Sequence, residues 1–167
     1  LMLDAARRAS AKKVVAVVPY FGYGRQDRKD KPRVPISSRL LIDLMAVGGV
    51  DRIITMDLHS PQIQGFANVP FDHLYSSIAL IDRLKQVGLN EDSGCVLAPD
   101  VGSAKMSQAY AKRLNVSFAL IDKRRPKANE AKVANLVGDL NDKHVLIIDD
   151  MIDTAGTICN AADTAME

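Results

Sequence analysis

Five short runs of mostly apolar residues recur along this chain, and helical patterns lie between several of them. Each run is almost continuously apolar, which indicates a strand buried on both of its faces. Buried strands that alternate with helices are typical of parallel sheets flanked by helices. The sequence therefore predicts an α/β fold with mostly parallel sheets. The runs are VVAVVPY from Val14, RIITMDL from Arg52, CVLAPD from Cys95, VSFALID from Val116 and HVLIIDD from His144.

The helical patterns show where the chain divides. Three of them begin with serine, at Ser37, Ser76 and Ser103, and serine is a good N-cap residue. The first series of strands and helices ends near residues 74–77, where a second series begins. We therefore predict two α/β domains, residues 1–75 and 76–167. The chain opens and stops inside helical patterns, so we expect both domains to be truncated parts of a longer protein.

A cluster of polar residues follows each apolar run. Every cluster lies at the carboxyl end of a predicted parallel strand, which is where open α/β sheets bind their ligands. One such loop would be weak support for a binding site, whereas five together favour one strongly. The clusters are FGYGRQDRKDKPRVP, HSPQIQGF, PDVGS, KRRPKANEA and DDMIDTAGT.

The composition excludes several other classes of protein. Apolar residues make up 47% and charged residues 25% of the chain, as in ordinary globular domains. A net charge of +2 gives no global attraction for nucleic acid or membranes. Cys95 and Cys159 lack metal-ligand spacing and fit reduced cytosolic thiols. The sequence shows neither a signal peptide nor an apolar run of about 18 residues, so we expect a cytoplasmic protein.

The loop after the last apolar run combines carboxylates with a turn that suits a phosphate. Small residues and hydroxyls let successive N–H groups of the turn face one concavity, and the following helix adds its positive end. Asp149 and Asp150 would repel a phosphate but would accept hydrogen bonds from a sugar diol. The alternative is a capped turn whose two aspartates are solvated or hold a divalent metal. The proposed phosphate-binding residues are Asp153, Thr154, Ala155, Gly156 and Thr157.

The segment VLIIDDMIDTAGT resembles the ribose-5-phosphate-binding signature of the type I phosphoribosyltransferase fold, in the form found in ribose-phosphate pyrophosphokinases. Four further segments occur in that family's order: PYFGYGRQDRKDKPRVPIS, MDLHSPQIQGF, APDVGSAK and IDKRRPKAN. The resemblance implies two phosphoribosyltransferase-like domains. It also implies the reaction of ATP with ribose 5-phosphate to give AMP and 5-phosphoribosyl 1-diphosphate, which feeds nucleotide biosynthesis.

The resemblance also assigns residues to ATP and to Mg²⁺, the expected cofactor. The basic stretch from Arg25 to Arg33 would by itself be a solvated loop or a nonspecific nucleic-acid patch. In the family this loop binds ATP, which implies Arg25, Gln26 and Asp30 as ATP-binding residues. His59 would contact ATP through Mg²⁺. Asp100 would be the second metal position, in a pyrophosphate loop formed by Asp100, Val101 and Gly102.

Further roles follow from the same resemblance. Lys123 and Arg125 correspond to catalytic positions on a flexible loop that closes over the active site. Gln64 and Asp72 are possible regulatory contacts. The family also implies a homo-oligomer in which a neighbouring subunit completes the ATP site.

Two other functions remain open. A phosphoribosyltransferase would share the sugar-phosphate loop but would transfer the sugar to a base. A catalytically silent, associated regulatory subunit would share the whole fold. Because family chains are about twice as long as this one, we expect the 167 residues alone to be inactive.

Overall fold

The computed structural model describes residues 1–124 and 133–166, and it divides the chain into two compact units. Unit 1 is Leu1–Ser76 and unit 2 is Ser77–Glu167. The sequence placed the division one residue earlier, between residues 75 and 76. No helix of the described residues is long and apolar enough to cross a membrane. The two units are described separately below.

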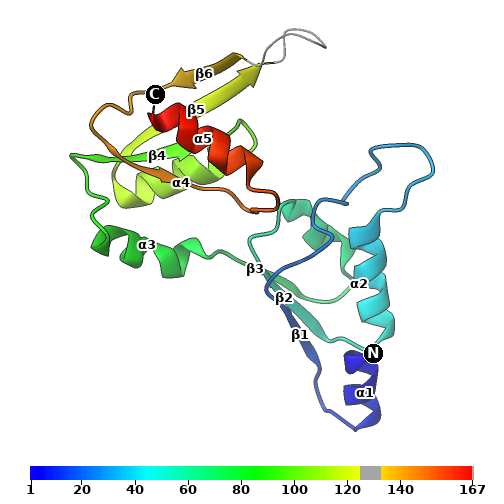
Figure 1. Cartoon of the computed structure of the whole chain (residues 1–167). Helices are drawn as coiled ribbons and strands as arrows, with labels where there is room; N and C mark the ends of the chain where they lie inside the picture. The colour runs from blue at the N-terminus through cyan, green and yellow to red at the C-terminus, as the bar shows by residue number, and fades with distance from the viewer. Residues whose placement is uncertain (125–132, 167) are drawn as a thin grey trace. The chain divides into compact units, whose positions relative to one another are not determined.

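Unit 1 is built on a three-stranded parallel sheet in the order β1-β2-β3 (Figure 1). Val15 of β1 pairs with Arg52 of β2, and Ile53 of β2 pairs with Phe71 of β3. The sheet leaves a long loop, residues 19–36, between β1 and the next helix. The elements are α1 (Met2–Arg8), β1 (Val15–Val18), α2 (Ser37–Val47), β2 (Arg52–Met56), the 3-10 helix η1 (Pro61–Phe66) and β3 (Phe71–Leu74).

The core of unit 1 fixes the start of that long loop. Phe21, three residues after β1, is buried among Ile42 of α2, Ile53 of β2 and Ile63 of η1. Burying an aromatic ring of this size contributes roughly 2–3 kcal/mol. The loop is therefore anchored at its first turn.

Unit 2 contains a four-stranded sheet in the order β6-β5-β4-β7. The central strand β4 runs parallel to both β5 and β7, whereas β6 is antiparallel to β5. The elements are α3 (Ser77–Gln86), β4 (Gly94–Ala98), α4 (Ala104–Leu114), β5 (Ser117–Arg124), β6 (Val133–Val137), β7 (His144–Ile147) and α5 (Gly156–Met166).

Helices cover the sheet of unit 2 on both faces (Figure 1). Every residue of β4 is buried, and its side chains alternate between the two sides. Cys95 and Leu97 pack with Ala161 of α5, and Val96 packs with Tyr110 and Leu114 of α4. This arrangement explains why the run from Cys95 is continuously apolar.

The predicted α/β class with mostly parallel sheets flanked by helices is confirmed. All five apolar runs form strands, but β3, β6 and η1 have no counterpart in the prediction. The sequence FDHL of β3 is short and polar, and its strand is stabilised by pairing with β2. Likewise β6 is held by its antiparallel pairing with β5. For β3 and β6, pairing with a neighbouring strand therefore determines the structure more than the local sequence pattern does.

Candidate functional site

The basic loop after β1 folds back onto the start of α2. Gln26 donates its N–H to the Tyr23 carbonyl at 2.9 Å and accepts two bonds on its own carbonyl. Both come from Ser38, from the backbone N–H at 3.2 Å and from Oγ at 2.8 Å. Ser38 is fully buried, while Arg25, Gln26 and Asp30 are exposed. The predicted ATP-binding residues thus lie on a tethered but accessible loop.

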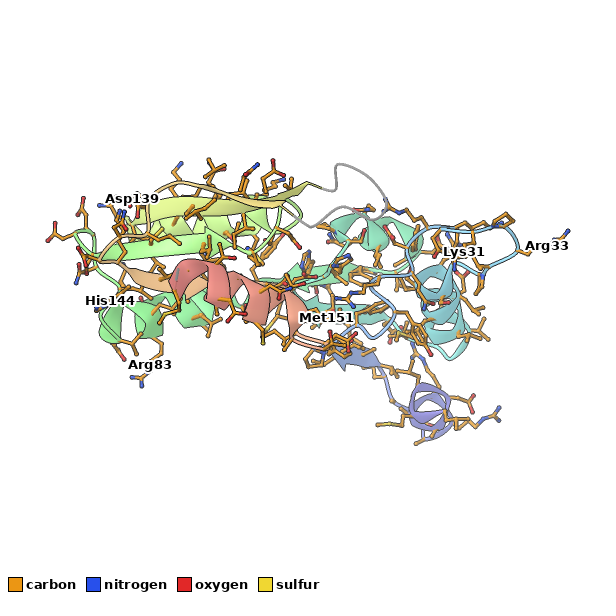
Figure 2. All side chains as sticks on the ribbon, turned by 45° about the horizontal axis from the view of Figure 1, so that its top comes forward. Lys31, Arg33, Arg83, Asp139, His144 and Met151 are labelled. Carbon is orange, nitrogen blue, oxygen red and sulfur yellow. The ribbon has the colours of Figure 1, made fainter. Side chains whose placement is uncertain are left out.

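The outer part of the same loop carries further positive charge. Figure 2 shows Lys31 and Arg33 at its far end, and both are exposed. Arg33 adopts a left-handed backbone conformation, with a φ of 65°. This φ is uncommon for a residue with a Cβ and marks a sharp turn in the chain.

The segment that contains His59 lies against the basic loop. A Cβ built on Gly24 would lie 3.6 Å from the Cβ of His59, so the two backbones approach closely there. Asp27 Oδ2 accepts hydrogen bonds from Ser60 Oγ and, at 3.0 Å, from Gln62 Nε2. The bond from Ser60 is the main reason why the pKa of Asp27 is lowered. The structure therefore brings the ATP-binding candidates and His59 together.

A half-buried histidine supports the turn just before His59. His73 of β3 accepts the Leu58 N–H on Nε2 at 2.9 Å, so its neutral form carries the proton on Nδ1. Burial lowers the pKa of His73, and the nearby Asp57 carboxylate opposes that shift only in part. Asp57 has a φ of 43°, and its carboxylate accepts the Ser76 N–H at 3.3 Å. Hydrogen bonds of Asp57 and Leu58 thus fix the turn that precedes His59.

The two possible regulatory residues both have partners inside unit 1. Gln64 Nε2 donates to the Pro61 carbonyl at 2.8 Å, within η1. Asp72 forms a half-exposed ion pair with Arg52 at 2.6 Å, across neighbouring strands. Their regulatory role stays a prediction.

In unit 2, Asp100 begins the turn from β4 into α4. Its Oδ1 accepts the Ser103 N–H at 3.0 Å, and Ser103 Oγ donates to the Asp100 carbonyl at 2.9 Å. These two bonds close the turn that precedes α4, and Ser103 stands at the N-cap position of that helix without a side-chain capping bond. Val101 and Gly102 are exposed at the tip of the turn.

Asp149 and Asp100 come from neighbouring strands. Leu97 of β4 pairs with Ile147 of β7, so the residues that follow both strands leave the sheet at the same edge. Burial raises the pKa of Asp149 to about 6, and the charges of Asp150 and Asp100 add to the effect. The Asp150 N–H donates to Asp149 Oδ1 at 2.9 Å. Three carboxylates therefore share this edge, as the sequence suggested.

The predicted phosphate loop ends in a conformation that the sequence did not predict. Ala155, not Gly156, has the left-handed backbone, with a φ of 61°. Gly156 instead begins α5, and a Cβ on it would meet only Thr154 Oγ1, at 3.7 Å. Asp153 and Thr154 are exposed, and Thr157 is half-buried in the first turn of α5. Open space therefore lies in front of the helix end.

The predicted catalytic cations fall at the edge of the described residues. Lys123 lies within β5, which continues to Arg124 through its pairing with β6. The sequence placed Lys123 and Arg124 at the start of a loop, whereas both lie in this strand. Arg125 lies outside the described residues.

The predicted metal ligands can be compared with the side chains that the structure describes. In residues 1–124 and 133–166, no group of three or more His, Cys, Asp or Glu side chains could hold a metal ion. The two predicted metal ligands belong to different units, His59 to unit 1 and Asp100 to unit 2.

Sequence reasoning missed three residues that shape the candidate site: Asp27, Ser60 and His73. Asp27 stands between predicted ligands in RQDRKD, but nothing in the local pattern distinguishes it from a solvated charge. Ser60 and His73 act through partners far along the chain, and such contacts leave no periodic signal.

Comparison with known proteins identifies two families along the chain. Residues 1–49 match the N-terminal domain of ribose phosphate pyrophosphokinase, and residues 77–167 match the phosphoribosyl transferase domain. The chain is 55% identical to a ribose-phosphate pyrophosphokinase of Chlorobaculum tepidum, over 100% of this chain and 51% of that protein. It is 51% identical to one of Clostridium perfringens, over 98% of this chain and 51% of that protein.

The solved structures give the same result. A crystal structure of phosphoribosylpyrophosphate synthetase from Mycobacterium smegmatis matches with a TM-score of 0.87 and 39% identity, over 99% of this chain and 53% of that one. The chain thus spans about half the length of the relatives it matches. It belongs to the phosphoribosyl transferase domain family, in the form found in ribose-phosphate pyrophosphokinases.

Proposed function

We propose that the longer protein containing this chain is a ribose-phosphate pyrophosphokinase. It converts ATP and ribose 5-phosphate to AMP and 5-phosphoribosyl 1-diphosphate. Relatives with this name match 100% and 98% of the chain, at 55% and 51% identity. The observation that carries the proposal is the loop after β7, where Asp149 and Asp150 precede the open start of α5.

The loop suits a phosphorylated sugar. Backbone N–H groups at the start of α5 and the Thr154 and Thr157 hydroxyls bind the 5-phosphate at the helix's positive end. The Asp149 and Asp150 carboxylates accept hydrogen bonds from ring hydroxyls. Because the pKa of Asp149 is about 6, this carboxylate is mostly ionised at neutral pH and is an acceptor for hydroxyl donors.

The reaction moves a diphosphoryl group in one step. The anomeric oxygen bonds to the β-phosphorus of ATP while the bond from that phosphorus to the bridging α-phosphate oxygen breaks. AMP leaves with the bridging oxygen, and the hydroxyl proton passes to water. Such transfers depend mainly on positioning and charge stabilisation. We assign positioning of ATP to Arg25, Gln26 and Asp30, and charge stabilisation to Lys123 and Arg125.

Mg²⁺ fits this donor set as a companion of ATP. This ion binds proteins through one or two carboxylates and completes its shell with substrate phosphates and water. Asp100 supplies a half-buried carboxylate, which suits such a shell, and His59 supplies an exposed imidazole. Bound Mg²⁺ would neutralise polyphosphate charge.

An AMP-release assay on the longer protein tests the proposal. ATP, Mg²⁺ and ribose 5-phosphate should yield AMP and the diphosphate ester in equal amounts, measured by chromatography and phosphorus NMR. A phosphoribosyltransferase would instead consume the diphosphate ester with a base, and a silent subunit would do neither. In calorimetry, ribose 5-phosphate should bind far more tightly than ribose. Equal affinities would mean that the loop after β7 does not bind the 5-phosphate.

A further inference from the structure

Asp27, Ser60 and Gln62 join the basic loop to the segment of His59. Ser60 Oγ donates to Asp27 Oδ2, and Gln62 Nε2 donates to the same oxygen at 3.0 Å. Asp27 is 33 residues away from Ser60 along the chain, so the bond fixes a tertiary arrangement rather than a local turn. We call these three residues the loop clamp.

The clamp lies directly beside the predicted ATP ligands. Asp27 follows Gln26, and Ser60 follows His59. Ser60 is only 7% exposed, and Gly24 packs against His59, so little space separates the two segments. Apart from Phe21 and Gly24, most residues of this loop are exposed, and five of nine residues from Arg25 to Arg33 are cationic. Mutual repulsion and chain entropy favour spreading of such a loop.

We propose that Asp27 is a positioning residue, which holds the basic loop against the His59 segment in the arrangement that ATP requires. This inference rests on the proposed function. Asp27 acts through Ser60 and Gln62 and does not itself touch the nucleotide. Ordering the loop before ATP arrives lowers the entropy cost of binding, so losing the clamp weakens ATP binding and leaves ribose 5-phosphate binding unchanged.

The geometry supplies a conservative variant. Because both donors meet one oxygen, the single carbonyl oxygen of asparagine can accept both bonds without the negative charge. Alanine removes the acceptor and leaves the nearly buried Ser60 hydroxyl without this partner. A positioning role therefore predicts that Asp27→Asn is mild and Asp27→Ala is severe. A direct role of the charge on ATP or Mg²⁺ predicts that both are severe.

The experiment uses the longer protein with Asp27→Ala, Asp27→Asn, Ser60→Ala and the double alanine variant. The matched control is Asp43→Ala, which removes a carboxylate that pairs with Arg39 on the exposed side of α2. We expect Asp27→Ala and Ser60→Ala each to raise KM for ATP about tenfold, with KM for ribose 5-phosphate and kcat within about twofold. The KM for ATP of the double variant should be no higher than that of the more impaired single variant, because the two residues share one bond.

Hydrogen exchange of the ligand-free protein gives an independent measurement. Asp27→Ala should accelerate exchange in peptides spanning residues 22–28 and 58–64, while Asp27→Asn and Asp43→Ala should not. If the unmodified protein releases no AMP, the proposed function fails, and exchange alone decides whether the clamp holds the loop. Unchanged exchange in Asp27→Ala, or equal rises of KM for ATP in Asp27→Ala and Asp27→Asn, would overturn the proposal.

Discussion

Several single residues of this chain have a structural role that the sequence did not predict. Asp100 was predicted as a metal position, and it also closes the turn before α4 through Ser103. Asp27 carries no predicted role, yet it joins two loops. Ala155 adopts the left-handed backbone that a glycine would be expected to provide. In each case the second role depends on geometry that forms only when the chain folds.

The carboxylate of Asp149 should make stability depend on pH. Its pKa is raised from 3.8 to about 6 by burial and by Asp150, so between these values the folded state binds more protons than the unfolded state. Stability from this group is therefore present below about pH 4 and falls as pH rises to about 6. Asp149→Asn should remove that fall and stabilise the protein at pH 7.5, with little gain at pH 4.

Urea unfolding of the longer protein at both pH values checks this expectation. Asp163→Asn, which removes an exposed carboxylate from α5, is the matched control for loss of a charge. The same Asp149→Asn variant should bind ribose 5-phosphate more weakly, because it loses an ionised acceptor. If Asp149→Asn is less stable than the parent at pH 7.5, burial and the neighbouring carboxylates do not destabilise the ionised form of Asp149.

Glycine 156 should be required by the ligand rather than by the fold. A Cβ there meets only Thr154 Oγ1, at an ordinary 3.7 Å, and alanine favours helices by up to about 1 kcal/mol over glycine. Gly156→Ala should therefore leave the melting temperature unchanged or higher. Its methyl group would occupy the space in front of the helix end, so ribose 5-phosphate affinity should fall by about tenfold or more.

Calorimetry and thermal unfolding separate the two effects of Gly156→Ala. Gly65→Ala is a suitable control, because its Cβ would meet nothing within 4 Å and should change neither quantity. Retained sugar-phosphate affinity in Gly156→Ala would place the phosphate elsewhere.

At the scale of elements, the strand ends decide where chemistry can occur. The parallel register of β4 with β5 and β7 directs Lys123, Asp100 and Asp149 toward one edge of the sheet of unit 2. The antiparallel strand β6 extends β5 as far as Arg124. A parallel sheet thus gathers the candidates, and the antiparallel pairing of β5 with β6 carries Lys123 beyond it.

Lys123, which lies in β5, and Arg125 should act mainly on the transition state. Negative charge builds up on the leaving oxygen of AMP as its bond to phosphorus breaks, and the family resemblance assigns these two cations to the stabilisation of that charge. In the longer protein, Lys123→Ala or Arg125→Ala should lower kcat by roughly 10²- to 10⁴-fold, with KM values changing far less.

Arg124→Ala is the internal control for this pair, since the family resemblance assigns roles only to the cations on either side of it. Steady-state kinetics on the three variants distinguishes the possibilities. If Lys123→Ala raises only the KM for ATP, the cation binds substrate in the ground state and is not catalytic.

Much of this element-level arrangement was predictable from the sequence, for definite physical reasons. Strands such as β4 are buried on both faces, so their apolar runs identify them without tertiary information. The strand β3 contains Asp72 and His73, whose side chains bind Arg52 and the Leu58 N–H from other parts of the chain. The local sequence pattern contains no information about such partners. This strand, and the support that His73 gives to the turn before His59, could therefore not be predicted.

At the scale of the whole molecule, the chain holds two units but only about half the length of its relatives. Several apolar side chains are exposed in unit 1, among them Val17 of edge strand β1, which is 65% exposed. Exposed apolar edges of this kind favour association between molecules.

The 167-residue chain by itself should therefore show little activity. We expect its AMP release to be less than about 1% of that of the longer protein, a loss of about 3 kcal/mol or more in transition-state stabilisation. Sedimentation should show association at micromolar concentration. The longer protein, assayed in parallel, is the control, and comparable turnover by the two proteins would mean that these 167 residues contain the whole active site.

The complete burial of β4 also gives unit 2 a built-in chemical reporter. Cys95 lies in this strand and has no exposed surface, whereas Cys159 is exposed on α5. A thiol reagent can label Cys95 only when the sheet opens, and it can label Cys159 in the closed state. The ratio of the two alkylation rates therefore measures the free energy of opening of unit 2, in the intact protein and without denaturant.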